Sequence, residues 1–156
     1  MLELLSNIFY LNKLSYLAFI MMSKRCKYAL KAMVRLARNY NQGFLSTSVI
    51  AQDENIPKKF LEQILLELKR VKLVNSKQGK AGGYYLLKSP DDVSLADIYR
   101  IFDGPIALTS CASLNFYEAC DDCVDEAVCY LRKELMIVRE KTRKSMMEAT
   151  LTKFIN

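Results

Sequence analysis

The sequence contains no histidine among its 156 residues. This absence excludes Ser-His-Asp and Cys-His catalysis, histidine metal ligands and pH switching by imidazole. A bound metal must therefore take its ligands from cysteine, carboxylate or backbone oxygen. Glycine and proline are also scarce, at 5 and 3 residues, which argues against a turn-rich all-β fold and favours helices.

Long apolar runs are missing as well. The run Leu14–Met22 falls far short of the ~20 residues that span a bilayer. The N-terminal stretch carries Glu3 and no early positive charge, unlike a secretory signal. We therefore expect a cytoplasmic protein with no membrane partner. Residues 1–21 differ in character from the rest, and we interpret them as a dispensable leader or mis-assigned start. A membrane-surface helix is the alternative.

Charge is divided unevenly along the chain. Residues 23–90 carry fourteen Lys/Arg and four Asp/Glu, whereas residues 91–156 carry eight and twelve. A basic half joined to an acidic half indicates a polyanion-binding module coupled to a second function. Taken by itself, the basic half is equally consistent with a solvated surface.

Apolar periodicity predicts a helix-turn-helix in the basic half. Residues 25–40 repeat apolar side chains at three- and four-residue spacing. Ser46 is a good N-cap for a short second helix, and Pro57 suits the first position of a third helix that runs to about Arg70. This spacing is typical of helix-turn-helix motifs, although many small helical pairs share it. Ser94 is expected to cap a further short helix.

A β-hairpin is predicted directly after the third helix. Residues 73–77 and 84–87 have the character of strands, and residues 78–83 contain the glycines of a flexible turn. A hairpin in this position is a wing, and its glycines permit positive φ and close approach to a sugar-phosphate backbone. A nucleotide phosphate loop is rejected because no helix N-terminus follows the turn.

The residues expected to contact double-stranded DNA lie on these helices and on the hairpin. The lysines would position the protein on phosphates, Glu62 can accept from a cytosine amino group, and Gln63 can pair with adenine. Phe60 suits either a thymine methyl contact or the core. The full predicted set is Ser46, Thr47, Lys58, Lys59, Phe60, Glu62, Gln63, Lys69, Lys77, Gln78, Lys80, Gly82 and Gly83.

Four of the five cysteines fall in one short stretch, Cys111-x8-Cys120-x2-Cys123-x5-Cys129. In a reducing compartment, clustered cysteines are more often ligands than disulfides. Four thiolates can complete one tetrahedral zinc site or anchor one iron–sulfur cluster. A thiol switch without metal is the third possibility. Cys26 lies within the first helix and is expected to be a buried core residue.

A long charged helix is predicted from Asp125 to Thr150. Val128, Leu131, Leu135 and Val138 fall on one of its faces. A helix this long and otherwise polar is expected to bury that stripe against a partner subunit, giving a homodimer. Packing against its own domain is the alternative.

Taken together, these segments resemble the Rrf2 family of bacterial repressors over roughly Met22–Leu151, nearly the whole chain. The similarity implies a winged helix with a long dimerisation helix, and recognition-helix residues Glu62 and Gln63 that face bases. Relatives often have arginine where this wing has Gln78. The segments that carry the resemblance are Arg25-Cys26-Lys27-Tyr28-Ala29-Leu30-Lys31, Ile50-Ala51, Phe60-Leu61-Glu62-Gln63-Ile64-Leu65, Leu68-Lys69 and Gly82-Gly83-Tyr84.

The resemblance also implies that three loop cysteines hold a two-iron or four-iron cluster. By position Cys111 matches the first ligand and Cys129 the last, while Cys120 and Cys123 compete for the middle place. Some members use histidine as the fourth ligand and others an N-terminal aspartate, whose position Lys27 occupies here. The extra cysteine can fill that gap. A single Cys-x2-Cys pair also disfavours structural zinc, which usually shows two.

The sequence thus predicts a mainly α fold with a small β-hairpin wing. Its parts are a winged helix-turn-helix at 22–105, a cysteine-rich cluster loop at 106–124, and a dimerisation helix with a tail at 125–156. The predicted function is a dimeric DNA-binding transcription regulator, most simply a repressor, that responds to an iron–sulfur cluster or thiol state. Alternatives are a cluster-free repressor sensing a small ligand and a regulator with structural zinc. A thiol oxidoreductase using Cys120-x2-Cys123 is remote, because no βαβ unit is visible.

Overall fold

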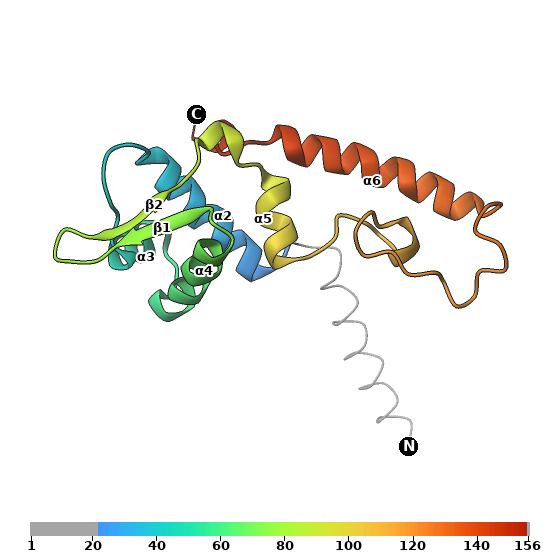
Figure 1. The fold of residues 1–156 in the computed structure, drawn as a ribbon, viewed down its shortest axis with the longest axis horizontal. Helices are drawn as coiled ribbons and strands as arrows, with labels where there is room; N and C mark the ends of the chain where they lie inside the picture. Colours follow the sequence, from blue (N-terminus) through green and yellow to red (C-terminus); the bar gives the residue numbers. More distant parts are fainter. Residues whose placement is uncertain (1–21, 156) are drawn as a thin grey trace, which may run out of the picture.

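The structure is a computed structural model that describes residues 22–155. The prediction for residues 1–21 concerns residues outside this range. The described chain is elongated, with the hairpin at one end, the cysteine loop at the other, and a long helix running back along one side (Figure 1). The elements are α2 (Lys24–Arg38), α3 (Thr47–Glu54), α4 (Lys58–Arg70), β1 (Val74–Lys77), β2 (Gly83–Leu86), η1 (Pro90–Asp92), α5 (Leu95–Phe102), η2 (Ser110–Ala112), α6 (Tyr130–Glu148) and η3 (Leu151–Phe154).

The hydrophobic core lies among α2, α3, α4 and α5. Met33, Ile50, Leu61, Leu65 and Ile98 have no exposed surface. They come from four different helices, and those of α4 recur at four-residue spacing, so each helix turns one apolar stripe inward. The mainly helical architecture with a two-stranded antiparallel hairpin confirms the fold class predicted from the sequence.

Side-chain caps fix where the helices begin. The Ser46 hydroxyl accepts from the Val49 amide at 3.3 Å, and Ser94 forms a reciprocal capping box with Asp97, as their residue types predict. Asn55 adopts a left-handed conformation after α3 and turns the chain toward α4. Pro57 is the N-cap of α4, one position earlier than predicted.

The hairpin pairs Val74 with Leu86 at its base and Lys77 with Gly83 near its turn. Tyr84 also exchanges two backbone hydrogen bonds with Leu45, at 3.0 and 2.8 Å, which fastens the hairpin to the segment before α3. A Cβ at Gly83 would lie 2.4 Å from the Leu45 carbonyl oxygen, and one at Gly82 would lie 2.2 Å from a carbonyl oxygen of β1. These two glycines therefore accommodate the protein's own backbone, and their predicted contact with a DNA backbone stays a prediction.

The long helix differs from its prediction at both ends. It begins at Tyr130, so Val128 lies outside it and is 76% exposed. The cysteine loop accordingly extends to Cys129. After Glu148 the chain forms η3, where Leu151 is fully buried in the winged-helix core. The residues predicted to be a tail thus close the core that α2, α3, α4 and α5 form.

No residue of α6 is buried within the single chain. Leu131 is 56% exposed and Val138 45% exposed, and Leu135 is half-buried, so the predicted apolar stripe is only partly covered within residues 22–155. Within the same range, no helix is long and apolar enough to cross a membrane.

Candidate nucleic-acid interface and metal centre

Ion pairs divide the basic residues into two groups. Four cations of α2 pair with acids of α3 and α4, so their charge is neutralised within the fold. Three of the four acids in residues 23–90 are used in this way, which leaves Glu62 as the fourth. Among the described cations that form no ion pair are Lys58 and Lys59 at the start of α4 and Lys80 at the tip of the hairpin. The pairs are Arg25–Glu67, Lys31–Glu54, Arg35–Asp53 and Arg38–Glu54.

The N-terminus of α4 is suited to a phosphate. No side chain caps it, and the first helical amide that hydrogen-bonds to backbone in the described chain is that of Phe60, which donates to the Pro57 carbonyl at 3.0 Å. Lys58 and Lys59 are exposed beside these amides and form no ion pair with any described residue. Helix dipole, amides and ammonium groups all favour an anion at this point.

One face of α4 is open to solvent. Glu62 and Gln63 are both exposed, and Leu66 is 52% exposed. Arg70 is exposed one turn further on. Leu66 and Arg70 were missed as site residues. Leu66 is four and three residues from Glu62 and Gln63, and Arg70 is four residues beyond Leu66, so all four lie on one face.

Three predicted DNA residues are engaged inside the protein. Phe60 packs edge-on against Tyr28 with ring centroids 5.8 Å apart, although it remains 37% exposed. Lys69 donates from Nζ to the Ser76 hydroxyl at 2.7 Å and so joins α4 to the hairpin. Lys77 lies with Nζ 5.3 Å from the centre of the Phe44 ring.

The remaining hairpin residues form the tip of the wing. Gln78 and Lys80 are exposed, and Gly79 between them has φ of 116°, which favours glycine. The turn lies at the far end of the molecule from the cysteine loop (Figure 1). At the base of the wing, Ser46 is exposed and Thr47 is half-buried.

The four loop cysteines form two pairs. Cys111 is 6% exposed, and its Sγ lies 3.3 Å from the Thr109 hydroxyl. Hydrogen bonds from Thr109 and from Cys120 lower the pKa of Cys111, whereas its contact with Cys111 raises the pKa of Cys120 to about 11. Desolvation and the neighbouring Cys129 raise the pKa of Cys123.

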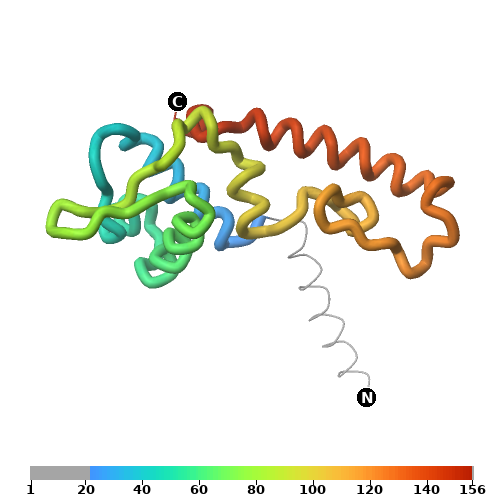
Figure 2. The backbone as a smooth tube through the Cα atoms, viewed as in Figure 1, coloured from blue at the N-terminus to red at the C-terminus, as the bar shows by residue number. Residues whose placement is uncertain are grey.

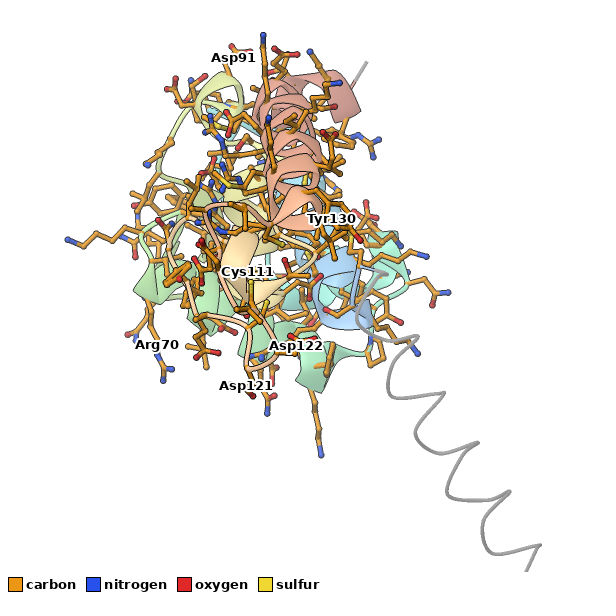
Figure 3. The ribbon with its side chains drawn as sticks, turned by 90° about the vertical axis from the view of Figure 1, so that its right-hand side faces the viewer. Arg70, Asp91, Cys111, Asp121, Asp122 and Tyr130 are labelled. Carbon is orange, nitrogen blue, oxygen red and sulfur yellow. The ribbon has the colours of Figure 1, made fainter. Side chains whose placement is uncertain are left out.

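The predicted four-cysteine metal site is not assembled in this arrangement. Within residues 22–155, no three or more cysteine or carboxylate side chains are gathered closely enough to hold a metal ion. The donor chemistry of four thiols in one loop suits iron–sulfur or zinc, but the thiols lie in pairs. Figure 3 shows Cys111 beneath the start of α6 at Tyr130, while Asp121 and Asp122 occupy the lower edge of the loop.

Two arginines of α6 fasten the loop to that helix. Arg132 donates from Nε to the Cys111 carbonyl at 3.0 Å, and Arg139 donates from Nη1 to the Ala112 carbonyl at 2.6 Å. Cys129 is itself the N-cap of α6, because its Sγ accepts from the Arg132 amide at 3.4 Å. Both arginines were missed from the sequence, where they are two of many charges on a polar helix.

The other end of α6 joins the winged-helix core. The Leu95 amide donates to the Ala149 carbonyl at 2.8 Å, and the Leu151 amide donates to the Val93 carbonyl at 2.9 Å. Figure 2 shows the whole path, from α5 through the loop and back along α6. One helix therefore connects the cysteine loop with the body that carries α4.

Comparison with known proteins agrees with this architecture. Residues 22–156 match the Rrf2 family, described as an iron-dependent transcriptional regulator. The chain belongs to the Rrf2 family. An Rrf2-like HTH-type transcriptional regulator of Rhodobacter capsulatus is 47% identical over 116 residues, which cover 72% of this chain and 77% of that protein.

Solved structures of Rrf2 proteins have the same fold. CymR of Bacillus subtilis, titled the global cysteine regulator, superposes with a TM-score of 0.72 at 29% identity and covers 87% of this chain and 96% of its own. IscR of T. potens superposes with a TM-score of 0.65 at 24% identity, covering 87% and 86%, and this likeness concerns the fold alone. The resemblance inferred from the sequence is thus confirmed. As a member of the Rrf2 family, the protein is a transcriptional regulator.

Proposed function

We propose that this Rrf2 protein is a cytoplasmic homodimeric repressor whose affinity for duplex DNA is set by an iron–sulfur cluster in the cysteine loop. The observation that carries the proposal is the continuous connection through α6. Arg132 and Arg139 hold the loop backbone at one end, and Leu151 is buried in the winged-helix core at the other. A change in the loop therefore acts on the helix that positions the DNA-binding body.

DNA binding uses α4 as recognition helix and the hairpin as wing. Lys58, Lys59 and Lys80 contact phosphates, while Glu62 and Gln63 face base edges in the major groove. The ion pairs support these roles, because four cations of α2 pair with acids of the protein, whereas Lys58, Lys59 and Lys80 pair with no described acid.

Dimerisation uses the exposed part of the apolar stripe of α6. Leu131 and Val138 are seven residues apart, at 56% and 45% exposure, which is the spacing of a seam between two long helices. A two-fold axis there places the two recognition helices for a pseudo-palindromic operator with half-sites about 34 Å apart.

The residues that would hold the cluster are Cys111, Cys120, Cys123 and Cys129. A bound cluster would supply a centre that oxidants alter or remove. Cys129 is the N-cap of α6, and Cys111 lies in the loop segment that α6 holds. Arg132 donates to the Cys129 sulfur and to the Cys111 carbonyl, so a change at either residue would reach α6 through Arg132. Coupling of ~1–3 kcal/mol is typical of such linked sites.

Anaerobic purification of the full chain tests the cofactor. We expect visible absorption that bleaches in air, with iron and sulfide in the protein, and loss of both in the Cys111→Ser and Cys129→Ser variants. Cys26→Ser is the matched control, because this thiol is buried in the core and its replacement leaves the spectrum unchanged. Colourless protein without iron, or with stoichiometric zinc, contradicts the cluster assignment.

A thiol switch is the second candidate, and the pairwise contacts of Cys111 with Cys120 and of Cys123 with Cys129 favour it. Each pair can lose two protons and two electrons to a disulfide or hydroperoxide oxidant and form a disulfide. Colourless protein that shows these two disulfides by peptide mapping after oxidation, and a changed DNA affinity, would establish this function in place of the cluster.

A further inference from the structure

A cavity of about 190 Å³ opens between α5, the cysteine loop and α6. None of the four loop thiols lines it, and it lies apart from α4 and the hairpin. Its wall combines three arginines with apolar side chains. The lining residues that matter here are Arg100, Arg139, Arg143, Pro105, Ile106 and Phe116.

Arg139 is an unusual member of this wall. Its side chain is only 10% exposed, and one nitrogen, Nη1, donates to the Ala112 carbonyl. Its Nε is the one buried side-chain nitrogen or oxygen in residues 22–155 without a hydrogen-bond partner. A buried donor on a charged group is unfavourable when unpaired. Arg139 also lines the cavity, so a small shift of its side chain toward an acceptor bound there would be favourable.

The charge around the cavity is positive. Arg143 makes its hydrogen bonds to Glu140 at 3.0 and 2.5 Å, and Glu140 also approaches Arg139 at 4.0 Å. Arg100 is exposed and forms no ion pair with any described residue. Three guanidinium groups thus face one carboxylate, and planar guanidinium groups match the two oxygens of a carboxylate.

We propose that this cavity binds a small organic carboxylate. Its head group accepts hydrogen bonds from Arg139 and Arg100, and its apolar part packs on Pro105, Ile106 and Phe116. The apolar half of the wall favours an organic acid over inorganic phosphate, and the volume of about 190 Å³ is too small for a nucleotide.

The site stays open when two chains associate through α6. At ~100° per residue, Arg143 lies about 140° around the helix from Val138, which belongs to the partly exposed apolar stripe. A bound carboxylate therefore reaches the loop segment that follows Cys111 without competing for the proposed dimer seam. Carboxylate binding requires no cluster, so a protein that binds no carboxylate would leave the proposed DNA-binding and cluster-sensing function unaffected.

Isothermal titration of the full chain with butyrate, butyramide and inorganic phosphate tests the site. We expect saturable binding of butyrate, with butyramide and phosphate each at least about tenfold weaker, because butyramide lacks the charge and phosphate lacks the apolar part. Arg100→Gln and Arg139→Gln should each weaken butyrate about tenfold or more. Lys144→Gln is the control, since it removes the same charge from an exposed position on α6.

Arg139 also anchors the loop, so its variant requires a thermal unfolding curve that matches the wild type. If that variant is unfolded, Arg100→Gln decides, because Arg100 holds no other element in place. The proposal would be overturned if butyrate did not bind, if butyramide bound as tightly as butyrate, or if phosphate bound more tightly than butyrate. It would also be overturned if Lys144→Gln weakened butyrate binding as much as Arg100→Gln does.

Discussion

Replacing Lys58 and Lys59 together by glutamine tests how this protein holds DNA. Each lysine that neutralises a phosphate adds ~0.9 to the slope of log affinity against log salt. Both side chains are exposed at the uncapped start of α4, so their loss should lower the slope by about 1.8. Between ~50 and ~200 mM salt, the wild type should then lose about twelvefold more affinity than the variant.

The matched control removes the same charge from α2. Lys31 and Arg35 pair with Glu54 and Asp53 at 3.5 and 2.7 Å, so the Lys31→Gln, Arg35→Gln variant should keep the wild-type slope. Fluorescence anisotropy with labelled duplex DNA over a series of salt concentrations measures all three proteins. Equal slopes for the two double variants would refute the division of the basic residues into paired and DNA-binding groups.

Three further predictions concern the body of the protein. Leu151→Ala should lower the free energy of unfolding by ~2–5 kcal/mol in urea titrations. Phe154 is 36% exposed, so Phe154→Ala should lower it far less. Equal effects of the two substitutions would mean that η3 does not close the core. Gly83→Ala should destabilise the hairpin, because the new Cβ would lie 2.4 Å from a backbone oxygen. Gly79→Ala should destabilise it less, because its Cβ would enter open space and only the positive φ is unfavourable. Hydrogen exchange of the hairpin amides measures both variants, and faster exchange in Gly79→Ala than in Gly83→Ala would contradict the steric reason. Burial raises the pKa of Cys26 from its ordinary value near 9 to about 12. The unfolded thiol therefore ionises first, and stability should fall as pH rises from about 9 toward 12; Cys26→Ala should remove that part of the fall, and an unchanged pH profile would show that the thiol does not cause it.

Local signals made much of the fold predictable. Ser46 and Ser94 are capping residues by their side-chain chemistry, and each caps the helix that the sequence assigned to it. The ends of α6 were not predictable in the same way. Residues 125–129 have an acidic composition typical of a first helical turn, yet Cys129 caps the helix. Leu151 enters the core only because the chain returns to Ser94 over a long separation in sequence.

The sequence predicted which types of residue form the candidate sites, but it predicted poorly which of these residues contact one another. Composition identified the basic half, but it could not tell Arg35 from Lys58, because pairing with Asp53 depends on how α2 meets α3. Spacing gathered four cysteines into one loop, but it could not give their pairing. Arg132 and Arg139 act through contacts with loop carbonyls, and charge patterns carry no signal for such contacts.

The proposed coupling between the cysteine loop and DNA binding is tested by comparing the DNA affinity of the protein with and without the loop's metal. A duplex selected from genomic fragments by the anaerobic protein would be titrated at one fixed salt concentration with cluster-loaded and metal-stripped protein. We expect affinities that differ about tenfold, in line with a coupling of ~1–3 kcal/mol, and a much smaller difference in a Cys111→Ser, Cys129→Ser variant. Equal affinities for loaded and stripped wild-type protein would contradict the proposed coupling.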